Sequence, residues 1–420
     1  MPTRSRYSPN NYRFFNRLLR ISFGAWVKRA YKVRTFGLEA VRGTRPPYVI
    51  IPTHASMIDP FMVGSLVPEP VYWVTSDGNM RTRLMRFLLR LVGSIPKSKA
   101  IPDLETVGMM VDVVRKKRGV VGIFAEGQAS WDGRTQGVFP STAKLLKLLK
   151  VPVFVVVLKG VYLSLPRWSW RRRRGLVELE FKRAFEPEDL KALDADAIHE
   201  RLVASMAHDE FAWLGERRIS WRGRARAEHL ELALFMCPEC GAVGSLRSFR
   251  NRFRCLECGA HARVDRRGGF APIADSKGFR FRDIGAWDLW QGKAFRAWLA
   301  ERSAKRPGAP LFSDSGVALL RGRKMNPLRR LRTGSLVLYP DRLELAPLVG
   351  ARISFPLASL SGVGTLKQHL FEFYDGKALY QVRFARRWCS GRKWQAALEF
   401  LAELRGEQPE PAGRAFTMPL

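Results

Sequence analysis

Short apolar runs, rich in β-branched residues, recur through the first half of the chain. Three of them cover residues 48–51, 120–124 and 151–158. Runs of this length are typical of buried strands rather than helices. A fourth strand is predicted over 176–181, and residues 187–230 then turn helical. Because the longest run falls well short of the roughly 18–20 apolar residues that span a bilayer, we expect no membrane-crossing segment.

A predicted helix near the N-terminus has one apolar face and one basic face. Residues 1–34 contain nine lysines or arginines and no acidic residue. This pattern is typical of a helix lying in the headgroup layer of a membrane, where each basic residue near an anionic leaflet contributes about 1 kcal/mol. The alternative is a helix that packs its apolar face on the domain that follows. The apolar face comprises Phe15, Leu18, Leu19, Ser22, Phe23, Trp26 and Val27, and the other face Arg13, Arg17, Arg20, Gly24 and Lys28.

The last part of the chain alternates between apolar and polar residues in several short strands. Strands are predicted over 334–346 and 352–355, and a hairpin with a favourable Asp-Gly turn over 371–384. A helix follows over 391–405. Several strands closed by one C-terminal helix resemble a pleckstrin-homology or GRAM-like domain, which implies docking to lipid headgroups or to a protein. A purely structural module over 334–406 is the alternative.

Residues 266–333 are the best candidate for a linker, helical at first and then basic. Trp287, Trp290 and Trp298 lie in the helical part, at a spacing more typical of packing than of a ligand site. Nine lysines or arginines then occur over 302–332, in a stretch interrupted by prolines.

Composition indicates a folded protein with an extreme positive charge. The chain has 420 residues, 46% of them hydrophobic, and a formal net charge of +34. Its length suggests roughly two to four domains. The charge points to a polyanion as partner: nucleic acid, an anionic membrane surface or an acidic protein. No signal peptide is apparent, because charges break the N-terminal apolar stretch, so we expect a peripheral protein on the cytoplasmic face of the cell membrane.

His54 and Asp59 come directly after the first predicted strand, in the run Pro-Thr-His-Ala-Ser-Met-Ile-Asp-Pro. An imidazole and a carboxylate with four residues between them, at the exit of a strand, can be held side by side. The carboxylate would fix the tautomer of the ring and stabilise the imidazolium that forms when the ring accepts a proton. The alternative is structural: Asp59 caps a helix that begins at Pro60, and His54 is an ordinary loop residue.

Three further motifs follow this pair in order. Residues 93–99 are Gly-Ser-Ile-Pro-Lys-Ser-Lys, 124–130 are Phe-Ala-Glu-Gly-Gln-Ala-Ser, and 151–156 are Val-Pro-Val-Phe-Val-Val. With the histidine and aspartate, they resemble the glycerolipid acyltransferase family, which includes the lysophosphatidic acid (1-acylglycerol-3-phosphate) acyltransferases. That family carries His-x4-Asp, Gly-x-Ile-x-x-x-Arg, Phe-Pro-Glu-Gly-Thr-Arg-Ser and Val-Pro-Ile-x-Pro-Val. The resemblance covers about residues 35–185, under half of the chain.

The chain departs from the family pattern around the acceptor-phosphate site. Lys99 replaces an arginine, and a lysine binds phosphate as a point charge without the bidentate fork of a guanidinium. Ala129 replaces the other arginine and supplies no charge. Ala125, Gln128 and Val155 replace proline, threonine and proline. The resemblance therefore implies an acceptor other than a simple lysophosphatidic acid.

The resemblance also implies acyl transfer without a covalent intermediate. His54 would act as general base on an acceptor hydroxyl, oriented by Asp59, and the oxygen would attack an acyl thioester of coenzyme A or acyl carrier protein. Glu126, Gly127 and Lys99 would bind the lysolipid acceptor. Without the family match, a solvated loop carboxylate is the preferred interpretation of Glu126. General-base catalysis contributes on the order of a hundred- to ten-thousand-fold, so positioning and oxyanion stabilisation must supply the rest.

Four of the five cysteines form a second motif, in which two Cys-x-x-Cys-Gly pairs are separated by fourteen residues. The glycines permit the left-handed backbone of a tight knuckle. Thiolates at this spacing close a tetrahedral zinc site with every position filled, which predicts a zinc ribbon with a structural role. Disulfides are the alternative, disfavoured in a cytoplasmic setting. The ligands would be Cys237, Cys240, Cys255 and Cys258.

The sequence therefore predicts an α/β domain over 35–232, with a mixed sheet flanked by helices. A zinc ribbon over 233–265, the linker, the β-rich domain closed by a helix, and a tail over 407–420 would follow. The expected function is a membrane-associated acyltransferase acting on a polar lipid. The alternative is a non-catalytic adaptor that binds nucleic acid, protein or lipid headgroups through the ribbon and the basic surface. Nucleic acid is the less favoured partner, because the ribbon lacks a row of exposed aromatic residues.

Overall fold

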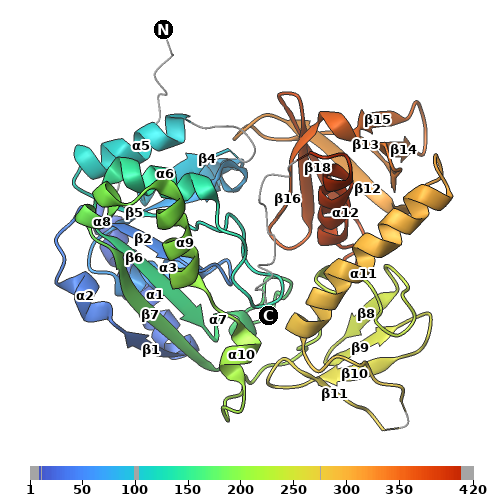
Figure 1. The fold of residues 1–420 in the computed structure, drawn as a ribbon, viewed down its shortest axis with the longest axis horizontal. Coiled ribbons are helices and arrows are strands. Elements are labelled where there is room, and N and C mark those ends of the chain that lie inside the picture. Colours follow the sequence, from blue (N-terminus) through green and yellow to red (C-terminus); the bar gives the residue numbers. More distant parts are fainter. Residues whose placement is uncertain (1–8, 11, 99–103, 275, 408–420) are drawn as a thin grey trace. The chain divides into compact units, whose positions relative to one another are not determined.

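The chain folds into two compact units (Figure 1). The computed structural model describes residues 9–407 except 11, 99–103 and 275. Among these, the first unit comprises 9–166 and 173–221, and the second 167–172 and 222–407.

A seven-stranded sheet forms the centre of the first unit. Its strands are β1 (Lys32–Phe36), β2 (Val49–Pro52), β3 (Val71–Ser76), β4 (Ile95–Lys97), β5 (Val120–Gly122), β6 (Val153–Lys159) and β7 (Leu176–Phe185). They lie in the order β1-β7-β6-β2-β5-β3-β4. The β6–β7 pair is antiparallel and the other five pairs are parallel. The predicted mixed sheet is confirmed.

Helices flank this sheet, as predicted. They are α1 (Arg13–Ala30), α2 (Leu38–Arg42), α3 (Asp59–Leu66), α4 (Arg83–Leu91), α5 (Leu104–Arg115), α6 (Pro140–Leu149), α7 (Val161–Ser164), α8 (Pro187–Ala192), α9 (Ala195–Met206) and α10 (Glu210–Leu214), with a 3-10 turn at Asp77–Met80. In the segment 187–230, predicted as helical, regular α-helix ends at Leu214.

The alternating side chains of β6 pack into two separate cores. Val153 and Val155 lie in the core that α5, α6, α8 and α9 cover, whereas Phe154 and Val156 lie in the core that α1, α2 and α3 cover. A strand covered on both faces has no solvent-facing positions, which explains why its sequence is continuously apolar. The short β2 is buried in the same way, so the loop that leaves it has a rigid support.

The predicted N-terminal helix forms as α1, and only its last part is buried. Gly24, Val27 and Ala30 are buried, whereas Phe14 and Ile21 are 72% and 65% exposed. The helix therefore divides between the two alternatives: its C-terminal end packs on the core, and its first turns leave an apolar face uncovered. Among the helices of the described chain, none combines the length and apolarity that crossing a bilayer requires.

The second unit contains two antiparallel sheets and two helices. The first sheet has four strands in the order β11-β10-β9-β8, and the second has seven in the order β15-β14-β13-β12-β18-β17-β16. The strands of the first are β8 (Leu246–Phe249), β9 (Arg252–Cys255), β10 (His261–Val264) and β11 (Phe270–Ala271). The helix α11 (Ile284–Lys305) precedes the second sheet, and α12 (Gly391–Leu404) follows it. The strands of the second are β12 (Phe312–Gly322), β13 (Arg329–Leu338), β14 (Arg342–Pro347), β15 (Ile353–Pro356), β16 (Leu360–Leu366), β17 (Leu370–Asp375) and β18 (Ala378–Phe384), and 3-10 turns occur at Leu230–Leu232 and Leu357–Ser359.

The segment 266–333, predicted as a linker, differs from that prediction. Its second half contains β12 and the first half of β13, and Val317 and Leu319 of β12 are fully buried. The basic side chains of this segment, such as Arg321 and Arg332, lie on exposed positions of the strands. Because these strands carry so many basic residues, their alternation of buried and exposed positions, typical of a sheet with one solvated face, was not recognised from the sequence. Phe235, α11 and the seven-stranded sheet share one hydrophobic core, so they form one unit.

Candidate functional site

The loop between β2 and α3 brings His54 and Asp59 together. β2 ends at Pro52, and α3 begins at Asp59 with Pro60 in its first turn. His54 Nδ1 lies 2.9 Å from Asp59 Oδ2. The Asp59 side chain is fully buried, whereas 18% of the His54 side chain is exposed. The pair predicted from the sequence is therefore a contact, with the imidazole at the surface and the carboxylate behind it.

The surroundings of Asp59 fix the tautomer of His54. Its Oδ2 also accepts hydrogen bonds from the backbone N–H groups of Ala55, at 2.7 Å, and Ser56, at 2.8 Å. An oxygen that accepts these bonds accepts from the ring as well, so Nδ1 carries the hydrogen and Nε2 keeps its lone pair. Burial raises the pKa of Asp59, and the hydrogen bonds from His54 and from the backbone oppose that rise. The geometry is that of a histidine base oriented by a carboxylate.

Glu126 is fully buried and holds the backbone of His54. Its Oε1 accepts from the His54 N–H at 2.6 Å, and its Oε2 accepts from the Gln136 N–H at 2.6 Å. The Ser130 N–H in turn donates to the His54 carbonyl at 2.8 Å. Burial raises the pKa of Glu126 to about 8, against the effect of the two backbone bonds. The loop after β5 therefore holds both the N–H and the carbonyl of His54 by hydrogen bonds, and we call this arrangement the clamp. Contact between Glu126 and an acceptor stays a prediction.

Gly127 occupies a position that a larger residue would disturb. Its φ is +69°, in the left-handed region, and a Cβ built there would lie 2.4 Å from Cε2 of Phe139. Both facts require glycine beside Glu126. The structure thus gives Gly127 a backbone role, next to the clamp on His54.

Aromatic rings support the imidazole from one side. The ring centroids of His54 and Phe124 are 4.2 Å apart, and Phe124 stacks on Trp73 at 5.3 Å. Trp73 comes from β3, and Phe124 lies two residues after the end of β5. Packing of this kind limits the ring to one orientation.

Lys99, the third predicted acceptor-binding residue, lies outside the described residues. Lys97 in the same motif is exposed at the end of β4, and its Nζ lies 5.3 Å from the ring centroid of Phe139, the ring that contacts Gly127. Lys97 is therefore a basic residue near the Glu126–Gly127 turn, which the family pattern did not single out.

The four predicted ligands converge into one cluster in the second unit. One sulfur from each of Cys237, Cys240, Cys255 and Cys258 lies within 4.8 Å of the others. The Sγ–Sγ separations are 3.8 Å for Cys237 and Cys258 and 3.7 Å for Cys240 and Cys255. A tetrahedral ion with metal–sulfur bonds of about 2.3 Å has sulfur–sulfur edges of about 3.8 Å. The cluster fits a metal ion with four thiolate ligands, and the described cysteines form no disulfide.

A feature that the sequence reasoning missed is the uncovered apolar face of α4. No residue of this helix is buried, and Leu84 and Phe87 are 67% and 59% exposed. Arginines at 83, 86 and 90 follow helical spacing, which places them together on the other side. The Tyr12 N–H donates to the Leu91 carbonyl at 3.2 Å, so the start of α1 adjoins the end of α4. The spacing of these arginines in an otherwise apolar segment was the available signal.

Residues 32–159 match the family model described as Acyltransferase. This part of the chain, which holds β1 to β6 and the His54–Asp59 pair, therefore matches the acyltransferase family, and the predicted resemblance is confirmed. The match covers less than a third of the chain. No curated protein matches the chain.

Among solved structures, similarity is found to the 1-acyl-sn-glycerophosphate (LPA) acyltransferase PlsC from Thermotoga maritima. The two are 16% identical with a TM-score of 0.38, over 46% of this chain and 79% of that chain. A chain of the 8S snRNP assembly intermediate aligns with 13% identity and a TM-score of 0.19, over 23% of this chain and 85% of that one. Both TM-scores are low, and the resemblance to the family therefore rests on the match over residues 32–159.

Proposed function

We propose that this protein is an O-acyltransferase that moves a fatty acyl group from an acyl thioester to a hydroxyl of a lysophospholipid or related polar lipid. The observation that carries the proposal is the hydrogen bond between His54 and Asp59, inside the segment that matches the acyltransferase family. The bare Nε2 of a partly exposed imidazole is the group that such a reaction requires.

In this mechanism His54 removes the proton from the acceptor hydroxyl as the oxygen attacks the thioester carbonyl. The carbon–sulfur bond then breaks, the leaving thiolate accepts the proton from the imidazolium, and the products are an ester and a free thiol. Asp59 stabilises the imidazolium and keeps Nε2 directed outward. A positioned general base contributes on the order of a hundred- to ten-thousand-fold to the rate.

The substrates follow from charge and from the altered motifs. Ala129 removes one of the two charges that the family pattern places at the acceptor phosphate, and Lys99 replaces the other arginine with lysine. We therefore favour an acceptor other than a simple lysophosphatidic acid. The net charge of +34 suits either donor, the phosphates of coenzyme A or an acidic acyl carrier protein.

Peripheral attachment to an anionic membrane surface is part of the proposal. α1 and α4 adjoin at Tyr12 and Leu91 and both carry exposed apolar side chains with arginines beside them. Such a face enters the headgroup layer, while the arginines contact anionic lipids. The cytoplasmic leaflet, which is the anionic one, is the expected partner.

A structural zinc ion in the four-cysteine cluster completes the proposal. Four thiolates fill a tetrahedral site and leave no position for a substrate, so the ion would stabilise the ribbon rather than take part in acyl transfer. The sulfur separations support this assignment.

Thioester turnover with a panel of lysolipid acceptors tests the enzyme. His54→Ala should lower kcat by about a hundred- to ten-thousand-fold. His199→Ala is the matched control, because His199 lies on α9 and should leave turnover unchanged. Turnover that survives His54→Ala contradicts the proposal. No turnover with any acceptor would instead favour the alternative, an adaptor that retains the fold as a scaffold.

A further inference from the structure

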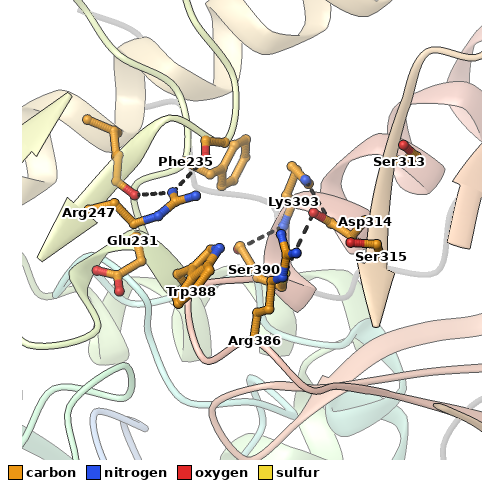
Figure 2. Close-up of a pocket in the computed structure, with 13 residues that line it drawn as sticks. Glu231, Phe235, Arg247, Ser313, Asp314, Ser315, Arg386, Trp388, Ser390 and Lys393 are labelled. Carbon is orange, nitrogen blue, oxygen red and sulfur yellow. Dashed lines mark hydrogen bonds and ion pairs between the residues drawn. The ribbon is translucent and has the colours of Figure 1, made fainter. Parts of the chain in front are cut away.

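A small cavity lies in the second unit, among residues from three separate segments. The segments are 244–247 at the start of β8, 313–315 in β12, and 386–393 at the start of α12, with Glu231 and Phe235 completing the lining (Figure 2). Its volume is about 190 Å³. That is below the roughly 300–1,000 Å³ of sites for drug-sized ligands and corresponds to about six water volumes. The cavity therefore suits a small polar group.

The guanidinium groups of two arginines lie over the same indole ring, that of Trp388, in this cavity. The Cζ atoms of Arg247 and Arg386 lie 5.0 Å and 5.8 Å from the ring centroid of Trp388. Among the described residues, neither arginine forms an ion pair. Two like charges gathered on one ring repel each other, and an anion placed between them relieves that repulsion.

Hydrogen bonds to the backbone fix the guanidinium of Arg247 and leave some of its donors available for a ligand. Its Nη1 donates to the carbonyls of Gly244 and Leu246, each at 2.7 Å. Nε and Nη2 then remain for a ligand, and a guanidinium presents such a pair of donors to two oxygens of a phosphate. Burial lowers the pKa of Arg247, and nearby Arg386 lowers it further, while Glu231 has the opposite effect.

The other charged residues of the lining are already engaged or neutralised. Lys393 Nζ lies 2.9 Å from Asp314 Oδ2, the pair joined by a dashed line in Figure 2. Asp314 also accepts from Trp394 Nε1 at 2.7 Å. The charges of Lys393 and Asp314 therefore neutralise each other. The remaining charges of the cavity are those of the two arginines and of a single acid, Glu231.

The environment of Glu231 indicates that the ligand carries a hydrogen-bond donor as well as an anionic group. It is 6% exposed, and its Oε2 has no hydrogen-bond partner among the described residues. A hydroxyl beside the anionic group would donate to this oxygen. The exposed hydroxyls of Ser313 and Ser315 add donors for the anion.

We propose that this cavity binds a phosphate monoester of about the size of glycerol phosphate, with Arg247 and Arg386 holding the phosphate. The same group occurs on a soluble metabolite and on the headgroup of phosphatidic acid, and the chemistry of recognition is shared. The site belongs to the second unit and is independent of acyl transfer.

The test compares Arg386→Ala with Arg387→Ala in the zinc-loaded full chain. Both arginines are exposed and each substitution removes one charge, but only Arg386 lines the cavity. One arm titrates sn-glycerol 3-phosphate by calorimetry. The other sediments vesicles of phosphatidylcholine with and without phosphatidic acid.

Arg386→Ala should weaken binding by about tenfold or more, the usual effect of losing a charge-assisted hydrogen bond, and Arg387→Ala by less than about twofold. Dependence on Arg386 in the soluble arm identifies a free phosphate ester, and dependence in the vesicle arm alone identifies a headgroup. Equal binding by the two variants in both arms, or no binding, overturns the proposal. Acyl transfer is not measured, so this result leaves the proposed activity untouched.

Discussion

At the residue scale, the three donors on Asp59 Oδ2 separate orientation from charge. In Asp59→Asn, the amide oxygen can still accept from Ala55, Ser56 and the ring, so the tautomer of His54 is kept while the negative charge is lost. Charge-assisted hydrogen bonds are worth about 1.5–3 kcal/mol, so kcat should fall by roughly ten- to a hundredfold. Asp59→Ala loses orientation as well and should fall further, with KM little changed in both. Steady-state kinetics with the best acceptor measures this, and an unchanged kcat in Asp59→Asn would contradict the role of the charge.

A second residue-scale prediction concerns the backbone beside the clamp. Gly127→Ala should destabilise the protein, because an alanine at φ +69° costs about 1–2 kcal/mol before any clash with Phe139. Gly108→Ala is the matched control. Gly108 lies inside α5 with nothing within 4 Å of an added Cβ, so the change should stabilise by about 0.5–1 kcal/mol. Denaturant unfolding distinguishes the two, and equal effects would show that Gly127 has no special backbone role.

At the scale of elements, the uncovered face of α4 predicts membrane binding. Leu84→Ser with Phe87→Ser should weaken binding to vesicles of phosphatidylcholine and phosphatidylglycerol by at least about a hundredfold, since each buried apolar side chain contributes about 1.5–3 kcal/mol. Leu348→Ser with Val349→Ser removes two apolar residues of the second unit that are even more exposed, and is the control. Sedimentation measures both, and equal loss would place the membrane contact elsewhere.

The four-cysteine cluster predicts that the ribbon depends on its ion. Cys237→Ser or a strong chelator should remove the zinc and unfold the ribbon, because binding of structural zinc supplies about 10–16 kcal/mol in small zinc domains. Cys389→Ser is the control, since this thiol lies outside the cluster. Metal analysis should give one zinc per chain for wild type and for the control. A full complement of zinc in Cys237→Ser would contradict the assignment.

At the scale of the whole molecule, His229 makes the stability of the second unit sensitive to acid. Burial, and then the nearby charges of Arg387, His369 and Arg171, lower the pKa of His229 to about 4 from 6.5, against the effect of Glu228. The unfolded chain therefore takes up a proton between these values that the folded chain does not. This contribution to stability is present above pH 6.5 and is lost as the pH falls toward 4, by at most about 3 kcal/mol.

His229→Asn should flatten that pH dependence. Asparagine tolerates the φ of +68° at this position and does not titrate. The packing of the ring on Trp170 is lost, so the comparison is of slopes between pH 4 and 6.5, taken from denaturant unfolding, rather than of absolute stability. Parallel profiles for wild type and variant would contradict the prediction.

The sequence was most informative where contacts are local. His54 and Asp59 are five positions apart, and spacing together with the family resemblance predicted their contact. The spacing of the four cysteines predicted their cluster. The clamp of Glu126 on the His54 backbone spans 72 positions, and no local pattern encodes it. β12 and the first half of β13 were missed because their solvated faces carry arginines, which outweighed the buried residues in a composition-based interpretation. The phosphate cavity combines residues from 231 to 393, and only the fold assembles it.

The position of Arg167 in the chain has a consequence for the synthesis of the protein on the ribosome. It is translated between α7 and β7 of the first unit, yet its buried Nη2 donates to Thr365, to the carbonyl at 3.1 Å and to Oγ1 at 2.8 Å. That partner is encoded 198 positions later. At about 5–20 residues per second, a ribosome needs roughly 10–40 s to reach it. The nascent first unit therefore emerges before Thr365 is synthesised, and a protein truncated after residue 221 would lack this partner of Arg167.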